Sequence, residues 1–153
     1  MIDVILKLEN SARARLSWIQ SFAASFGIVP KPIYGHIALC SLEHGDLEAC
    51  KAAVAGQKAF SVDFEQIDVL PDAPVVAALA ARTGVLEELH EKFSGSADWT
   101  PCVELLRDPM VNMGWVRSAM REMFKPFTAQ VVRVEFMENG TLVDGIDLEG
   151  DQA

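Results

Sequence analysis

The sequence lacks several features that would assign it to a class at once. Its 153 residues contain no apolar run approaching the roughly 20 residues that a membrane-spanning helix needs. There is no CxxC pair, and three cysteines, Cys40, Cys50 and Cys102, are an odd number that favours free thiols over a disulfide framework or a zinc site. The first residues include Asp3 and Lys7 and show no cleavage site, which is not typical of a signal peptide. We therefore expect a cytoplasmic protein without membrane segment, metal or cofactor.

Basic residues are also scarce. The chain has 13 Lys and Arg against 22 Asp and Glu, a formal net charge of −9. Long nucleic acids are bound by neutralising their phosphates, so this charge disfavours a long nucleic acid as a partner. A pocket can still be positive locally, which leaves a small phosphate or nucleotide ligand compatible with the composition. The oligomeric state is not determined by any of these features.

Half of the residues are hydrophobic, enough for the core of one domain of this length. Apolar periodicity predicts the order strand, helix, strand, helix, strand twice, over 1–71 and again over 74–148. The expected strands are 2–8, 33–42, 60–69, 75–81, 102–107, 130–137 and 142–148, and the expected helices lie within 10–26, 46–56, 85–93 and 109–124. The predicted fold class is α/β (α+β): a single domain of two pseudo-symmetric lobes, whose two sheets face a central cleft.

Two local patterns in the second half carry further expectations. Asn139-Gly140, between the last two strands, is a strong signal for a two-residue hairpin. Arg117, Arg121 and Lys125 recur every four residues and form one basic row on the last helix. We favour a solvated helix face for this row over a rim that steers an anionic ligand.

Two strands occupy the same place in the two halves and carry the candidate site. One contains His36 and the other contains Cys102. Because side chains alternate along a strand, Ala38 shares the face of His36, and Glu104 shares the matching face of Cys102. We expect His36 and Cys102 to lie on the central strands of their lobes, with both side chains directed into one cavity. Tyr34 shares the His36 face, and we expect it to contact whatever the cleft holds.

These segments resemble the paired motifs of the 2H phosphoesterase superfamily, which includes 2′-5′ RNA ligase-like proteins and cyclic phosphodiesterases. The family carries His-x-Thr-x or His-x-Ser-x in each lobe. Here the first motif, residues 36–39, reads His-Ile-Ala-Leu, and the second, residues 102–105, reads Cys-Val-Glu-Leu. The resemblance implies catalytic positions at His36 and Cys102, the latter at a degenerate second histidine position, and ligand-binding positions at Ala38, Glu104 and Tyr34.

The replaced residues weaken the chemistry that the resemblance implies. In this family one histidine acts as base and the other as acid on a phosphate ester, and losing one such group costs about 10²- to 10⁴-fold in rate. A thiol at Cys102 titrates about two units above an imidazole. A carboxylate at Glu104, about 5 Å from a phosphate, would repel it by roughly 3 kcal/mol, and Arg107 is expected on the opposite strand face. The resemblance thus implies a degenerate protein with weak or no cyclic phosphodiesterase activity and a retained ligand-binding cleft.

Three alternatives remain open at this point. The first is an active phosphoesterase that uses His36 with Cys102 or Glu104 on 2′,3′-cyclic phosphates or RNA ends, with or without a zinc ion held by these three residues. The second is a Cys102 nucleophile activated by His36. The third is a non-catalytic protein-interaction module, which a cleft filled by apolar side chains would favour.

Overall fold

The computed structural model describes residues 1–23, 36–70, 74–93, 99–107 and 112–148. Its elements follow the predicted order: β1 (Ile2–Leu8), α1 (Asn10–Ala23), β2 (His36–Leu42), α2 (Leu47–Val54), β3 (Phe60–Val69), β4 (Val75–Ala80), α3 (Gly84–Phe93), β5 (Cys102–Arg107), α4 (Met113–Met123), β6 (Phe127–Glu138) and β7 (Thr141–Asp147). The predicted α+β class and repeated order are confirmed. None of the described helices is long and apolar enough to cross a membrane.

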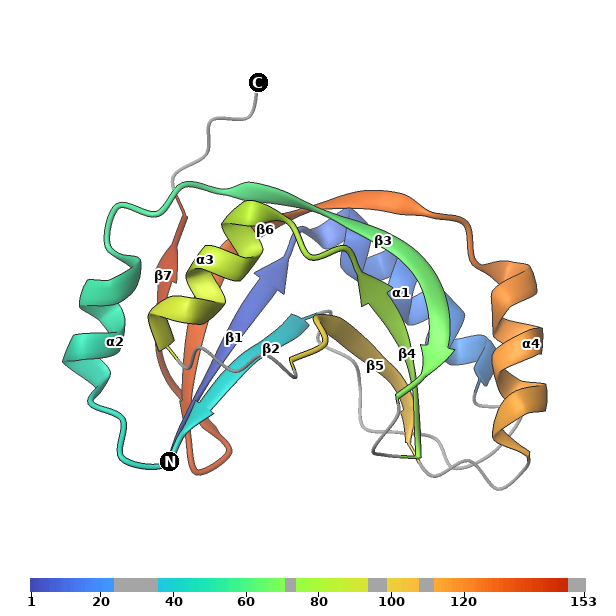
Figure 1. Ribbon diagram of the computed structural model, residues 1–153, viewed down its shortest axis with the longest axis horizontal. Coiled ribbons are helices and arrows are strands. Elements are labelled where there is room, and N and C mark those ends of the chain that lie inside the picture. Colours follow the sequence, from blue (N-terminus) through green and yellow to red (C-terminus); the bar gives the residue numbers. More distant parts are fainter. Residues whose placement is uncertain (24–35, 71–73, 94–98, 108–111, 149–153) are drawn as a thin grey trace.

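The strands form one antiparallel sheet rather than two separate ones. Its order is β2-β1-β6-β3-β4-β5, with β7 added beside β6. Residues 127–131 of β6 pair with β3. Residues 131–138 pair with β1 on one side, and residues 133–138 pair with β7 on the other. The long strand β6 therefore joins the two halves into the arch seen in Figure 1.

The strand order has the symmetry expected of a duplicated fold. It reads the same from either end when β1, β2 and β3 are exchanged with β4, β5 and β6. The third strands of the two halves, β3 and β6, pair at the centre. The exact lobe limits, 1–71 and 74–148, stay a prediction.

The expectation that the two motif strands are central is wrong. In this order β2 and β5 are the outermost strands, and among the described residues each is hydrogen-bonded to one neighbouring strand, β1 and β4 respectively. The two strands contact each other, and in Figure 1 they begin near one another at the centre of the molecule. Apolar periodicity identifies strands but not their order, because the order depends on pairing between distant segments.

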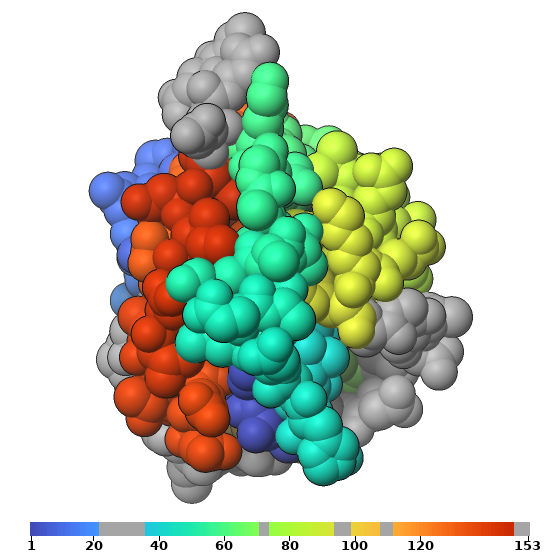
Figure 2. Space-filling view, turned by 90° about the vertical axis from the view of Figure 1, so that its left-hand side faces the viewer, coloured from blue at the N-terminus to red at the C-terminus, as the bar shows by residue number. Residues whose placement is uncertain are grey.

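One face of the sheet and the helices enclose the core. Phe64 and Phe136 are the largest fully buried side chains in it. Figure 1 shows α2 and α3 beside β1, β2 and β7, and α1 and α4 beside β3, β4 and β5. Figure 2 shows α2 next to β7 on the left-hand face, where the ammonium group of Lys51 lies 2.8 Å from the Asp144 carboxylate. We call the opposite side of the sheet the open face.

The hairpin prediction is confirmed. Asn139 and Gly140 both have positive φ angles, 51° and 82°, as a two-residue turn between right-twisted strands requires. The last helix begins later than expected: Asn112 is its N-cap and accepts a hydrogen bond from the Trp115 N–H at 3.1 Å. Residue 109, the expected start, lies outside the described residues.

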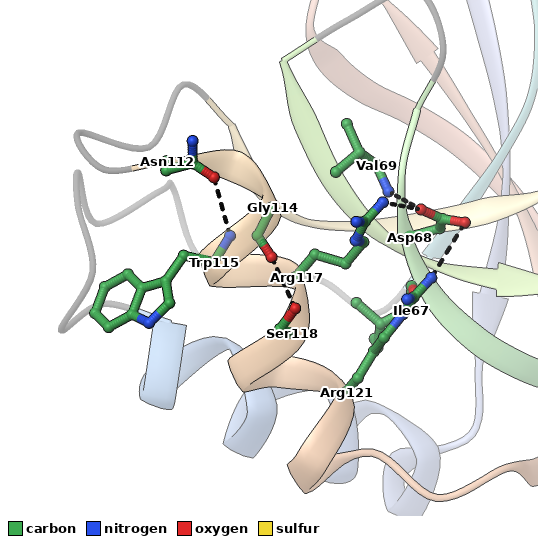
Figure 3. Close-up of polar contacts among 9 residues, drawn as sticks. All are labelled: Ile67, Asp68, Val69, Asn112, Gly114, Trp115, Arg117, Ser118 and Arg121. Atoms are coloured by element: carbon green, nitrogen blue, oxygen red, sulfur yellow. Dashed lines mark hydrogen bonds and ion pairs between the residues drawn. The ribbon is translucent and has the colours of Figure 1, made fainter.

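Two arginines of the basic row on α4 share one carboxylate partner and remain partly exposed to solvent. Arg117 and Arg121 approach the two carboxylate oxygens of Asp68 on β3, at 3.3 and 3.4 Å, as Figure 3 shows. Arg121 also donates from Nε to the carbonyl of Ile67 at 2.8 Å. The row therefore attaches α4 to β3, and Lys125 lies beyond the end of the helix.

Candidate functional site

A β-bulge interrupts both motif strands at the same position. In β2, Cys40 lies opposite Val4 and Ala38 opposite Ile5, so Leu39 has no residue opposite it. In β5, Leu106 and Glu104 lie opposite consecutive residues of β4, which leaves Leu105 unpaired in the same way. Both bulged leucines are fully buried. A bulge breaks the two-residue alternation and re-aims the side chains that follow it.

The burial pattern places the candidate residues on the open face. Ile37 and Val103 are buried in the core. His36 and Cys102 are half-buried on the other side, and Ala38 and Glu104 are exposed there. Tyr34 lies outside the described residues.

His36 belongs to a row of polar residues that crosses four strands. Lys7 of β1 lies opposite His36, Arg133 of β6 lies opposite Lys7, and Asp147 of β7 lies opposite Arg133. Residues paired in this way point to the same face of the sheet. The open face around His36 therefore carries charges of both signs: Lys7 and Arg133 are cationic, and Arg133 is paired with Asp147 and Glu135.

Burial lowers the pKa of His36, while the negative charges of Glu135 and Glu104 act in the opposite direction. Glu135 lies in the next row on β6, and Glu104 comes from β5 in the other half of the sequence. Their influence brings residues of both halves into one electrostatic environment. At neutral pH His36 is a neutral imidazole, the form that can accept a proton.

The expected position of Arg107 is wrong. Its Nη2 atom lies 2.6 Å from Oε1 of Glu104, so the two side chains share a face of β5. Strict alternation would separate residues three apart, but the bulge at Leu105 inserts one residue between them. The guanidinium group compensates the charge of Glu104, which reduces the repulsion that a bound phosphate would meet.

Cys102 does not have the environment of a reactive thiol. Burial raises its pKa to about 11, and the negative charge of Glu104 adds to the effect. It is therefore a neutral thiol at pH 7, neither an activated nucleophile nor an acid of useful strength. Within the described ranges no three His, Cys, Asp or Glu side chains converge to hold a metal ion, so the zinc alternative has no geometric support there.

Two residues stabilise the strand that contains His36, and the sequence did not identify either of them. His90 of α3 is buried and donates from Nδ1 to the Leu39 carbonyl at 3.0 Å, and Trp99 donates from Nε1 to the Ala38 carbonyl at 3.0 Å. The two rings are stacked, with centroids 4.0 Å apart. They bind the outer edge of β2 at its bulge. His90 stands between two glutamates in a helix, and no spacing pattern marks it.

The sequence matches no protein-family model. It also matches no curated protein at a significant level. Solved structures are similar over nearly the whole chain. E. coli LigT, in a crystal structure with NADP+, has a TM-score of 0.61 at 16% identity, covering 97% of this chain and 96% of LigT. A phosphoesterase crystal structure has a TM-score of 0.60 at 17% sequence identity, and the match covers 97% of each chain.

Protein TT0787 of Thermus thermophilus is also similar, with a TM-score of 0.66 at 15% identity over 99% of both chains. These structures are of the 2H phosphoesterase superfamily. The chain thus has the LigT-like 2H phosphoesterase fold, as the resemblance of the two motifs implied.

Proposed function

We propose that this chain is a degenerate 2H phosphoesterase-like protein. Its cleft binds a small phosphate or nucleotide ligand, with weak or no cyclic phosphodiesterase activity. The observation that carries the proposal is that two equally placed, bulged strands bring His36 and Glu104 into one electrostatic environment on the open face. A cytoplasmic location is part of the proposal.

Two basic residues near the motif positions support the ligand-binding part. Lys7 lies opposite His36, and Arg107 compensates Glu104. E. coli LigT has been crystallised with phosphate, 3′-AMP, ATP and NADP+, all of which contain phosphate groups. A phosphate group of such a ligand suits the cationic side chains of Lys7 and Arg107.

The absence of a second acid-base residue supports the low phosphodiesterase activity that we propose. His36 is neutral and can take a proton, but a thiol with a pKa of about 11 donates one poorly to a leaving group. Glu104 is ion-paired with Arg107 at 2.6 Å. Of the two other histidines of the chain, His44 is exposed and His90 is bound to the β2 carbonyl. We expect rates about 10²- to 10⁴-fold below those of a two-histidine enzyme.

The test measures turnover and binding in parallel. Purified protein is assayed with the four 2′,3′-cyclic nucleotides, and phosphate binding is followed by NMR in the parent, His36→Ala and the exposed-site control His44→Ala. We expect phosphate binding that His36→Ala weakens and His44→Ala does not, with turnover near background. Efficient turnover lost in His36→Ala would overturn the degenerate assignment, and no phosphate binding by the parent would overturn the ligand-binding cleft.

A further inference from the structure

Two rings from the second half of the sequence hold the outer edge of β2. Trp99 donates from Nε1 to the Ala38 carbonyl at 3.0 Å. His90 donates from Nδ1 to the Leu39 carbonyl at 3.0 Å. In a regular antiparallel strand successive carbonyl groups point to opposite sides. Here two consecutive carbonyls accept from one stacked pair of rings, an arrangement that the bulge at Leu39 allows. The pair is therefore fitted to the bulge of the strand that carries His36.

The Trp99 indole is fixed by groups that belong to α3 or are paired with it. The His90 ring of α3 stacks on the indole with an interplanar angle of 10°, and His90 is 3% exposed. The Arg82 guanidinium lies 6.0 Å from the indole centroid and is ion-paired with Glu87 of α3 at 2.6 Å. These contacts on the ring orient the indole N–H toward β2.

Trp99 also connects the two motif strands. It stands three residues before Cys102, the first residue of β5. The segment between them is anchored to β4, because the Pro101 carbonyl accepts from the Ala80 N–H at 2.9 Å. The backbone of Trp99 thus leads into one motif strand, and its side chain holds the strand that carries His36. In the described part of the chain β2 and β5 are not paired in the sheet, so their separation depends on contacts of this kind.

This separation determines whether the candidate residues can act together. The charge of Glu104 on β5 influences the pKa of His36 on β2, and such an interaction weakens with distance and with intervening water. Groups that act on one ligand need surrounding contacts that hold them within about 0.5 Å of their working geometry. We propose that His90 and Trp99 are positioning residues that set the separation of the two motif strands, so that His36 and Glu104 face one ligand. The identity of this ligand as a phosphate rests on the proposed function.

The experiment is a double-variant cycle on the pKa of His36, measured by NMR titration of its ring protons in the full chain without ligand. Glu104→Gln removes a negative charge from β5 and releases the Arg107 cation, and both changes should lower the pKa of His36. Trp99→Phe keeps an aromatic ring and removes the N–H. In that background we expect the lowering by Glu104→Gln to be about twofold smaller, because β5 is no longer fixed relative to β2 and water screens the interaction.

Further variants separate positioning from general stability. His90→Leu removes the other donor and should act like Trp99→Phe, whereas His90→Asn keeps an amide N–H near the position of Nδ1 and should retain most of the Glu104 effect. Trp18→Phe is the matched control, because it makes the same change at an indole that is 60% exposed on α1. Circular dichroism and thermal unfolding verify that each variant is folded.

Phosphate binding to the same variants connects the positioning role with the ligand. We expect Trp99→Phe to weaken it by about 5-fold, which corresponds to about 1 kcal/mol, and Trp18→Phe to leave it unchanged. An equal Glu104 effect in the parent, Trp99→Phe and His90→Leu overturns the positioning role. So does a reduced effect in Trp18→Phe, or one as small in His90→Asn as in His90→Leu. A parent that binds no phosphate overturns the proposed function, while the ligand-free cycle still decides the positioning role.

Discussion

The three cysteines share an environment that disfavours the thiolate. Burial is the largest cause in each case: it raises the pKa of Cys40 to about 12, that of Cys102 to about 11, and that of Cys50 above its usual value. At pH 8 the Cys102 side chain is then predominantly the neutral thiol. We expect iodoacetamide to modify each thiol at least about 10-fold more slowly in the native protein than in urea, as measured by mass spectrometry. Fast native modification confined to Cys102 would revive the nucleophile alternative.

His36 is the residue whose ionisation should report on the ligand. In the free protein, burial lowers its pKa below 6.5, so it is neutral at pH 7. A bound phosphate favours the imidazolium, so saturating phosphate should raise the pKa of His36, and protonation should in turn tighten phosphate binding. An NMR titration of the histidine ring protons with and without phosphate measures the change. The exposed His44 serves as the internal control, and an unchanged His36 in phosphate-saturated protein would place the ligand elsewhere.

At the scale of single elements, Asp68 links α4 to β3. Its backbone hydrogen bond from Val69 and its two arginine partners lower its pKa below 3.8. A carboxyl group whose pKa is lower in the folded than in the unfolded state contributes to stability. This contribution is fully present above the unfolded-state pKa and is lost as pH falls through the folded-state pKa. We expect Asp68→Asn to lower the free energy of unfolding by about 1 kcal/mol at pH 7, the scale of half-exposed ion pairs.

Denaturant unfolding at several pH values tests this expectation. The difference between Asp68→Asn and the parent should shrink as pH falls below 3.8. Glu48→Gln is the control, because Glu48 is 79% exposed and lies 3.9 Å from Lys51, so it should change stability by no more than a few tenths of a kcal/mol. A difference that persists unchanged in acid would mean that Asp68 acts through packing rather than charge.

Whereas the order of the strands in the sheet was not predictable, the elements and their order along the chain were, because apolar periodicity and turn residues act over a few positions. The hairpin at Asn139-Gly140 is such a case. The bulges at Leu39 and Leu105 were not, since a bulge exists only relative to the strand opposite it. The error at Arg107 follows from this, because one inserted residue reverses the face on which its side chain lies. The contacts of His90 with β2 join residues 51 positions apart, which no local pattern can reveal.

At the scale of the whole molecule, β2 and β5 occupy equivalent places in the strand order and differ in their side chains. Both keep the buried bulge, and both present half-buried residues on the open face. One retains an imidazole at His36, and the other carries Cys102 and Glu104 in the corresponding places. Under the proposed function, the backbone framework for two-residue acid-base chemistry is preserved while one half of the chemistry is missing. This separation allows the lost half to be restored without rebuilding the fold.

The restoring variant combines Cys102→His, Glu104→Thr and Ala38→Thr. The first change supplies an imidazole that can donate a proton near pH 7. The second removes the carboxylate and releases Arg107, which lies 2.6 Å from it, to bind a phosphate oxygen. The third supplies a hydroxyl on the exposed face of β2 beside His36. These side chains would act on one transition state, so their effects should not add.

Hydrolysis of a 2′,3′-cyclic nucleotide measures the gain. We expect the triple variant to exceed the parent by about 10²-fold or more, the contribution of one positioned acid or base. Cys102→His alone should do little, because Glu104 still occupies Arg107, and Glu104→Thr alone should improve phosphate binding more than turnover. Adding His36→Ala to the triple variant should abolish the gain, since the proton acceptor is then missing. A folded triple variant that neither binds nor hydrolyses the cyclic phosphate would show that the cleft has changed in shape as well as in chemistry, and the interaction-module alternative would then be favoured.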